Sequence, residues 1–156
     1  GSRAWSSSLA PPKGQVICPS HVKLLDYELE LGLVIGRDML GPQKITQASL
    51  IDFVCGIVMA NDISARDIQI PQGQWFKGKS FRTFCPTGPY LYILEKSDID
   101  RISDLQLTLK VNGEIRQNGN TRELLFQPVE TLKEISQIMD VWSGDLILTG
   151  TPGGVD

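Results

Sequence analysis

The stretch "DYELELGLVIG", residues 26–36, decides the fold class, because it combines the apolar pattern of a core strand with closely spaced acidic side chains. We expect a strand over residues 27–35. Successive side chains of a strand point to opposite faces, so Glu28 and Glu30 share one face while the leucines between them share the other. One interpretation is a half-exposed strand whose polar face is acidic. The other is a site for a hard divalent cation, because carboxylate oxygens suit Mg²⁺ and Mn²⁺.

A third acid that could complete a cation site lies in "ANDISARDIQ", residues 60–69. Asp62 follows a predicted strand and therefore lies at a strand exit. If the next residues turn helically, Arg66 and Gln69 line the same side as Asp62. The alternative is an ordinary ion pair between Asp62 and Arg66 on a helix surface, and the spacing alone leaves both interpretations open.

The remaining elements predict an α+β, β-rich fold, because strands outnumber helices and do not alternate regularly with them. The strongest local signal is Asn112-Gly113, which predicts a tight hairpin turn. Apolar residues at helical spacing predict a helix over residues 129–139. Ser64 and Asp67 resemble a capping box, which favours a short helical turn there. The other expected elements are strands over residues 55–60, 84–93 and 145–149, a hairpin over residues 105–117 and a helix over residues 46–53 with Thr46 as its N-cap.

The composition excludes several classes of protein. At 156 residues the chain has the length of one domain with a substantial core. Its net charge of -3 gives no general attraction to nucleic acids or anionic membranes, and no apolar run reaches the length of a membrane span. Cys18, Cys55 and Cys85 form no CxxC pair, so neither a disulfide framework nor a thiolate zinc site is expected. We interpret them as reduced, mostly buried thiols in a reducing compartment.

Five blocks of sequence resemble, in content and in order, the catalytic domain of the fumarylacetoacetate hydrolase superfamily from about residue 17 to the end. The blocks are "DYELELGLVIGRD", "ANDISARDIQ", "QWFKGKSFRTFCPTGP", "VNGEIRQNGNT" and "GDLILTGTPGGV". The resemblance implies a mixed β-sheet roll of the fumarylacetoacetate hydrolase C-terminal-domain type, which usually forms a homodimer. It also implies a cytoplasmic protein, or a mitochondrial one in a eukaryote. Residues 1–15 are then an N-terminal arm or loop, and residues 16–156 are a catalytic domain that is incomplete at both ends relative to the family.

The same resemblance assigns roles to seven residues. It implies that Mg²⁺ or Mn²⁺ is bound by Glu28, Glu30 and Asp62, that a small dicarbonyl or 2-oxo acid substrate is held by Arg66, Gln69 and Thr151, and that the catalytic residue is Lys79. A divalent cation would stabilise an enolate of such a substrate. That intermediate supports hydrolysis of a C–C bond, decarboxylation or keto–enol isomerisation. The sequence does not choose among these reactions, although the blocks look closest to members associated with aromatic catabolism or oxaloacetate.

One feature of hydrolytic members is missing at the expected place. Those members carry a histidine and a glutamate upstream of the metal strand, which together activate water. His21 is the only histidine in the sequence, and no glutamate follows it by three residues. We therefore expect His21 to be an exposed or edge histidine. The alternative function is a catalytically impaired metal-binding or dimerising module of the same fold.

Other residues near the blocks have simpler interpretations. Without the resemblance, both Lys77 and Lys79 would be assigned to the solvated surface. Trp75 is expected to be a packing residue, with a wall of the site as the alternative. The glycines of "TGTPGGVD" lack the spacing of a phosphate-binding loop, so they predict a turn that presents Thr151.

Overall fold

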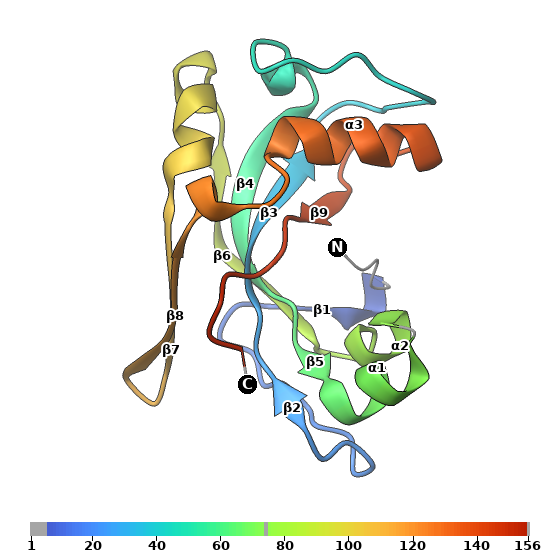
Figure 1. Cartoon of the computed structure of the whole chain (residues 1–156), viewed down its shortest axis with the longest axis vertical. Coiled ribbons are helices and arrows are strands. Elements are labelled where there is room, and N and C mark those ends of the chain that lie inside the picture. The colour runs from blue at the N-terminus through green and yellow to red at the C-terminus, as the bar shows by residue number, and fades with distance from the viewer. Residues whose placement is uncertain (1–5, 74, 156) are drawn as a thin grey trace.

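The computed structural model describes residues 6–73 and 75–155, and its centre is a five-stranded sheet with the order β1-β6-β4-β3-β9 (Figure 1). The β1–β6 pair is parallel and the other pairs are antiparallel, so the sheet is mixed. The strands of this sheet are β1 (Leu9–Ala10), β3 (Leu29–Ile35), β4 (Val54–Asn61), β6 (Cys85–Ile93) and β9 (Leu146–Leu148). Two further pairs are β2 (Leu25–Asp26) with β5 (Ser64–Ala65), and β7 (Gln106–Val111) with β8 (Glu114–Asn120).

Three α-helices and four 3-10 helices surround the strands in the described part of the chain. Figure 1 shows α3 across one end of the sheet, with α1 and α2 on the opposite side of the central strands from the β7–β8 hairpin. The helices are α1 (Arg66–Gln72), α2 (Trp75–Lys79) and α3 (Pro128–Ile138), with 3-10 turns at Ser6–Ser8, Leu50–Asp52, Lys96–Asp104 and Thr121–Glu123. No helix among the described residues is both long enough and apolar enough to cross a membrane.

The main hydrophobic core forms around β3. This strand has neighbours on both edges, and Leu31, Leu33 and Ile35 are almost completely buried. Val129 and Leu132 of α3 join the same core, which explains the apolar stripe of that helix. A strand buried in this way cannot shift its register without exposing its leucines, so the positions of the acids at its start are fixed as well.

Most of the predicted elements are confirmed. Asn112 and Gly113 have φ values of 52° and 87°, which is the backbone of a type I′ hairpin turn. The strand predicted over residues 27–35 begins only at Leu29, because Tyr27 and Glu28 form the connection between β2 and β3.

The helix predicted over residues 46–53 is wrong, because only Leu50–Asp52 are helical there and they form a 3-10 helix, while residues 47–49 are a turn. The backbone N–H of Thr46 donates to Ser49 Oγ at 3.0 Å, and that of Ser49 donates to Thr46 Oγ1 at 3.2 Å. Such local side-chain bonds compete with the regular hydrogen bonds of a helix.

The capping box predicted at Ser64 is also wrong. Ser64 belongs to β5, where it pairs with Asp26, and its hydroxyl donates to the backbone oxygen of Asp62 at 3.1 Å. The helix begins later, with Ala65 as its N-cap and no side-chain cap. Pairing with β2 therefore holds Ser64 in an extended conformation and delays the start of α1.

Two other expectations concern the N-terminal region and the cysteines. Within the predicted arm, Leu9 and Ala10 form β1 and pair with Cys85 and Pro86, so the described part of the arm lies along the sheet edge. All three cysteines are free, but only Cys85 is buried; Cys55 is half-buried and Cys18 is exposed, so the expectation of mostly buried thiols is wrong. The boundary of the arm at residue 15 stays a prediction.

Candidate metal and substrate site

Three acidic side chains from two strand ends meet in the interior. Glu28, Glu30 and Asp62 each place a carboxylate oxygen within 4.8 Å of the other two. Their exposed fractions are only 7%, 3% and 3%. The half-exposed acidic strand is therefore the wrong interpretation of residues 26–36, because both faces of the strand are buried at its start.

The antiparallel pairing of β3 and β4 brings these acids together. In such a pair the start of one strand lies beside the end of the other. Leu29 is paired with Asn61, and Glu30 with Ala60. The next residue of the connection, Asp62, donates its backbone N–H to the backbone oxygen of Glu28 at 2.8 Å. The convergence of residues distant in sequence is thus a consequence of strand register.

Lys79 provides positive charge inside this cluster. Its Nζ lies 2.7 Å from Glu28 Oε2 and 2.6 Å from Asp62 Oδ2, and the residue is 3% exposed. Burial opposes its charge, but the attraction of Asp62 and Glu28 outweighs burial and raises the pKa of Lys79 above its ordinary value. Lys77 on the same helix is exposed, so the interpretation of Lys79 as a surface lysine is wrong.

A close contact between two short helices places Lys79 there. Gly78 packs against α1 so tightly that an added Cβ would lie 2.8 Å from Gln69 Cβ and 3.1 Å from the backbone oxygen of Ala65. Any side chain at this position would push α2 away from α1. The glycine before Lys79 is therefore what allows the ammonium group to reach the carboxylates.

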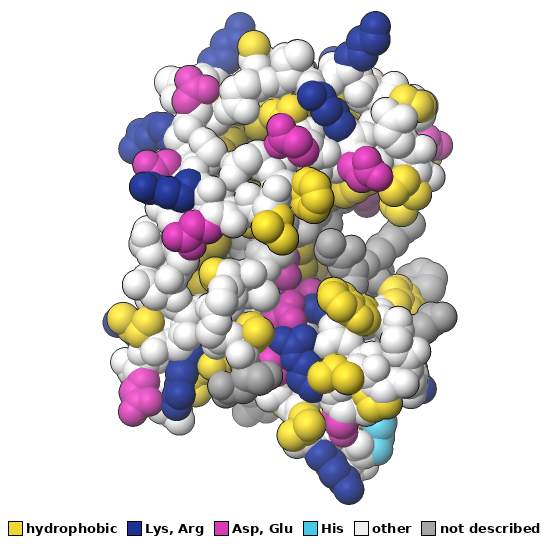
Figure 2. All heavy atoms as spheres, viewed as in Figure 1, with side chains coloured by type: hydrophobic (Ala, Val, Ile, Leu, Met, Phe, Trp, Pro, Cys, Tyr) yellow, Lys and Arg dark blue, Asp and Glu magenta, His cyan; other side chains and the backbone are white. Residues whose placement is uncertain are grey.

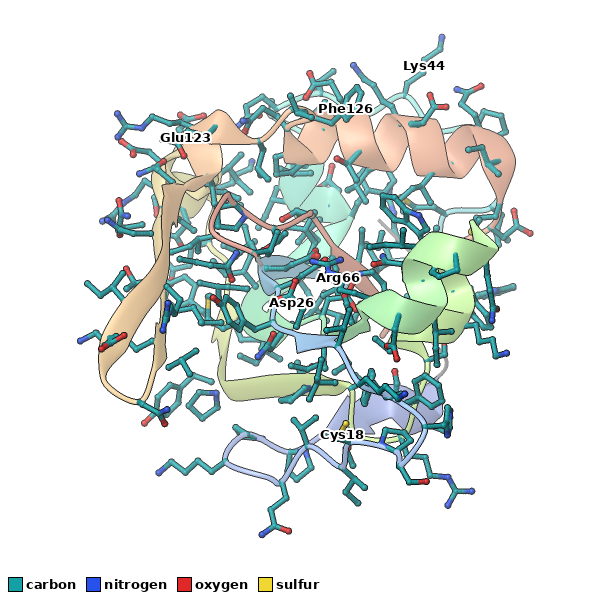
Figure 3. The ribbon with its side chains drawn as sticks, turned by 60° about the horizontal axis from the view of Figure 1, so that its bottom comes forward. Cys18, Asp26, Lys44, Arg66, Glu123 and Phe126 are labelled. Carbon is teal, nitrogen blue, oxygen red and sulfur yellow. The ribbon has the colours of Figure 1, made fainter. Side chains whose placement is uncertain are left out.

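Arg66 is fixed on the other side of Glu28. Its Nε and Nη2 donate to Asp26 Oδ2 at 2.8 and 2.6 Å, and its Nη1 lies 2.7 Å from Glu28 Oε1 (Figure 3). The same Nη1 donates to Gln69 Oε1 at 2.8 Å, which leaves the NH₂ group of Gln69 as the donor available to a ligand. The ion pairs of Arg66 thus involve Asp26 and Glu28, and the helix-surface pair expected from the spacing is not what orients this side chain.

The C-terminal segment closes the site from a third direction. β9 runs antiparallel to β3, so the residues after β9 lie beside the start of β3. The backbone N–H of Gly150 donates to Glu30 Oε2 at 2.6 Å. Gly150 has a φ of 99°, which is a conformation that favours glycine. The predicted turn is therefore present, and it supplies a backbone donor to one of the acids.

Gln117 positions Thr151 within that turn. This glutamine is completely buried, and its Nε2 donates to Thr151 Oγ1 at 2.8 Å and to the backbone oxygen of Pro152 at 2.9 Å. Its Oε1 accepts the backbone N–H of Leu29 at 2.8 Å. Because the Thr151 oxygen accepts from Gln117, the hydroxyl hydrogen is available to donate to a ligand.

The charges of this network do not cancel. When all are ionised, four carboxylates and two cations leave two uncompensated negative charges. The six side chains are Asp26, Glu28, Glu30, Asp62, Arg66 and Lys79. Burial, followed by repulsion from Asp62, raises the pKa of Glu30 to about 7, against the lowering effect of the Gly150 hydrogen bond. One divalent cation would supply the charge that the network lacks, so the donor set fits Mg²⁺ or Mn²⁺.

All seven residues assigned from the resemblance line one cleft of about 580 Å³. In Figure 2 this cleft is the hollow where acidic and basic side chains meet beside hydrophobic ones. The cleft is lined by Glu28, Glu30, Asp62, Arg66, Gln69, Lys79 and Thr151, together with Ile70, Trp75, Gly150 and Val155. Their chemical roles stay predictions, but the fold brings them together.

Three supporting groups were missed by sequence reasoning. Asp26, Gln117 and the N–H of Gly150 hold Arg66, Thr151 and Glu30 respectively. Asp26 had a signal, since it alternates with the two glutamates in the same short stretch. His21, in contrast, is exposed and packs edge-on against Phe81, with ring centroids 5.5 Å apart, as expected for a histidine outside the site.

Comparison with known proteins identifies the family. Residues 3–156 match the family model described as fumarylacetoacetate (FAA) hydrolase C-terminal. The chain belongs to the fumarylacetoacetate hydrolase family. A mitochondrial oxaloacetate tautomerase of Rattus norvegicus is 39% identical over 152 residues, which are 97% of this chain and 47% of that protein.

Solved structures of fumarylacetoacetate hydrolase family proteins share the fold. A 2-hydroxyhepta-2,4-diene-1,7-dioate isomerase from Mycobacterium marinum gives a TM-score of 0.85 at 34% identity, over 96% of this chain and 56% of the other. A fumarylacetoacetate hydrolase from Exiguobacterium antarcticum gives 0.84 at 37% identity, over 96% and 52%. The expected α+β, β-rich fold class is confirmed. The chain spans about half the length of the curated relatives it matches.

Proposed function

We propose that this chain carries the divalent-metal site of an enzyme acting on a small 2-oxo acid or 1,3-dicarbonyl compound. The observation that carries the proposal is the buried carboxylate triad, whose network is short of two positive charges. Glu28, Glu30 and Asp62 would hold the cation. Few proteins bury three carboxylates together without compensation, because each unpaired buried charge is costly.

The residues around the triad suit an anionic ligand with adjacent oxygens. A bound divalent cation would supply positive charge that stabilises the negative charge developing on a substrate oxygen. Arg66 and the NH₂ group of Gln69 would bind the substrate carboxylate, and the Thr151 hydroxyl would donate to a second oxygen. Each of these donors is already oriented by a neighbour, so binding costs little further ordering.

Lys79 is the candidate proton donor. Its raised pKa keeps the ammonium form, so it can deliver a proton or neutralise an enolate, while it is a poor base. In the enol-to-keto direction Lys79 would deliver its proton to the carbon, the enol O–H would release its proton to water, and the amine would be reprotonated from solvent, while the cation would stabilise the charge on the substrate oxygen. The names of the rat tautomerase and the mycobacterial isomerase support this reaction class, and we propose it ahead of hydrolysis or decarboxylation.

The test combines metal binding with turnover. Chelator-treated chain should bind one Mg²⁺ or Mn²⁺ by calorimetry, and the loaded chain should accelerate the interconversion of keto and enol oxaloacetate, followed by ultraviolet absorbance. Lys79→Ala should retain the metal and lower the rate by about 10²-fold or more. Lys77→Ala is the matched control, because it removes an exposed lysine from the same helix, and its rate should be unchanged.

Three outcomes would contradict the proposal in different ways. No binding of either cation would remove the metal site. Tight binding without turnover of oxaloacetate, acylpyruvates or unsaturated diacids would support the binding or dimerising module instead. A rate that is equally affected by both lysine substitutions would remove Lys79 from the reaction.

A further inference from the structure

Gln117 of β8 is a polar side chain buried outside the cleft. It is 0% exposed and is not among the described residues that line the cleft. We propose that Gln117 determines ligand specificity as a positioning residue, because it keeps the hydroxyl hydrogen of Thr151 free for an acceptor atom of the ligand. The inference rests on the proposed function, since Thr151 would contact the same ligand that the charged groups hold.

The orientation of the Gln117 amide is fixed by its partners. Its Oε1 accepts the backbone N–H of Leu29 at 2.8 Å, and its Nε2 donates to Thr151 Oγ1 at 2.8 Å and to the backbone oxygen of Pro152 at 2.9 Å. A backbone N–H can only donate and a backbone oxygen can only accept, so a reversed amide would lose both backbone bonds. The NH₂ group therefore faces Thr151, whose oxygen acts as the acceptor and whose hydrogen is left for a ligand.

The bond to Leu29 connects this amide to the metal-binding strand. Leu29 lies between Glu28 and Glu30, at the start of β3, where β9 no longer pairs with that strand. The Gln117 side chain takes the place of a strand neighbour there. A rotation of the amide that presented its oxygen to Thr151 would leave the buried N–H of Leu29 without an acceptor, which is costly. The donor is therefore held toward Thr151 by the backbone of the metal site itself.

Two glycines hold the turn after β9 directly against β8. An added Cβ at Gly119 would lie 2.5 Å from Pro152 Cβ, and one at Gly154 would overlap the backbone oxygen of Arg116. These contacts lie on both sides of Gln117 along β8, and Figure 1 shows the segment after β9 between the hairpin and β3. The turn thus has a fixed position. An isosteric change at Gln117 should alter the direction of the hydrogen bond in the turn without moving the turn.

The direction of that bond decides which ligand atom is favoured beside Thr151. With its hydrogen free, the hydroxyl can donate to a ligand oxygen. A ligand N–H at the same place would occupy the remaining lone pair and leave the hydroxyl hydrogen without an acceptor. If the hydroxyl had to donate to residue 117 instead, only lone pairs would face the cleft, and a ligand oxygen would lose its donor.

Oxalate and oxamate distinguish these cases. They are similar in size and share one carboxylate and one further oxygen, but the remaining group is an oxygen in oxalate and an NH₂ group in oxamate. Calorimetry on the whole, Mg²⁺-loaded chain measures the affinity for each. Because their charges differ, the quantity compared between variants is the ratio of the oxalate affinity to the oxamate affinity.

Gln117→Glu is the decisive substitution. It keeps the shape and the acceptor for Leu29 but replaces the donor to Thr151 by an acceptor. We expect the ratio to fall about tenfold, the loss of one hydrogen bond to a charged acceptor. In a Thr151→Val background we expect the same substitution to change the ratio by about twofold or less, because Gln117 acts through the hydroxyl. Repulsion of oxalate by the added charge would instead lower the ratio in both backgrounds.

Gln106→Glu is the matched control. It makes the same change at an exposed position of the partner strand β7, and the ratio should stay unchanged. Far-ultraviolet circular dichroism verifies the fold of each variant. If Gln117→Glu does not fold, Thr151→Val alone is the second measure, and it should lower the ratio about tenfold while Mg²⁺ affinity is retained.

The outcomes separate the two proposals. An unchanged ratio in Gln117→Glu, an equal fall in both backgrounds, or an equal fall in Gln106→Glu overturns the role of Gln117 alone. An unchanged ratio in Thr151→Val also overturns it, because the hydroxyl would then not contact the ligand. Absence of Mg²⁺-dependent oxalate binding by the unsubstituted chain overturns the proposed function and this inference with it.

Discussion

Glu28 and Glu30 are two residues apart, yet their carboxylates have different surroundings. Both oxygens of Glu28 contact cations, Arg66 on one side and Lys79 on the other. Glu30 receives a backbone N–H from Gly150 and lies close to the charge of Asp62. Burial and this repulsion raise the pKa of Glu30 to about 7, which makes it the acid that reports most directly on whether a cation is present.

The stability of the metal-free chain should therefore depend on Glu30. Its pKa is about 7 in the folded chain and about 4.5 in the unfolded chain, so folding favours the protonated form. This contribution is fully present below pH 4.5 and is lost as the pH rises through 7. Between pH 5 and 8, the free energy of unfolding should fall by about 2–3 kcal/mol relative to Glu30→Gln. Urea denaturation in chelator at both pH values measures this difference, and identical pH profiles for the two proteins would contradict it.

Residue-level reasoning from the sequence reached the acids but not their partners. The alternation in residues 26–36 placed two glutamates on one face, and a single correct strand register was enough to bring Asp62 beside them. The distinction between Lys77 and Lys79 depended on the family resemblance. It could not come from spacing, because it results from the contact of Gly78 with α1, which is a tertiary interaction.

At the scale of elements, the site forms where the ends of several strands meet. The start of β3, the end of β4 and the end of β9 meet, and the β7–β8 hairpin reaches them through the buried side chain of Gln117. Gln117 is the described residue of the hairpin that hydrogen-bonds both Leu29 and Thr151. Its hydrogen bond with Leu29 is buried, and those with Thr151 and Pro152 are partly buried.

Gln117→Leu should consequently destabilise the chain. The substitution keeps most of the volume but leaves the backbone N–H of Leu29 without its acceptor, and the expected loss is about 2–4 kcal/mol in the free energy of unfolding. Gln106→Leu is a matched control in the partner strand, where the side chain is exposed, and should change stability by about 0.5 kcal/mol or less. If urea denaturation shows equal changes in the free energy of unfolding for the two substitutions, the hydrogen bonds of the buried Gln117 amide do not stabilise the fold.

Elements with strong local signals were predictable, and those set by distant pairing were not. The Asn112-Gly113 turn and the apolar stripe of α3 are properties of short windows, so they could be found in the sequence. The break at Tyr27 and Glu28 between β2 and β3 and the extended conformation of Ser64 both accompany the β2–β5 pair. That pairing joins segments about forty residues apart in the sequence, so no local sequence pattern predicts it.

At the scale of the whole molecule, β6 leaves an apolar edge. It pairs with β4 along one side, but its described partner on the other side, β1, covers only Cys85 and Pro86. Four consecutive side chains beyond that point are exposed, namely Tyr90 (82%), Leu91 (49%), Tyr92 (54%) and Ile93 (61%). An open strand edge with exposed apolar side chains is a ready surface for another chain.

The homodimer implied by the family therefore has a testable location. We expect the chain to sediment as a dimer and the double substitution Tyr90→Lys with Ile93→Lys to shift it to a monomer, because two charges on each copy would face each other across the edge. Ile138→Lys, at a 67% exposed position of α3, is the control and should leave the dimer intact. A wild-type chain that sediments as a monomer, or a double variant that stays dimeric, would exclude this edge as the interface.

The position of Lys79 has a consequence for how the site responds to ions. Its ammonium group already neutralises oxygens of two of the three acids, so the chain carries an internal counter-ion in the place where an external one would act. A divalent cation that bound these carboxylates would compete with the ammonium group for them, and the displaced ammonium group would then be free to contact a bound ligand. Binding of the cation and displacement of the Lys79 ammonium group would then be one coupled equilibrium. By thermodynamic reciprocity, a ligand that binds the displaced ammonium group would raise the affinity for the cation.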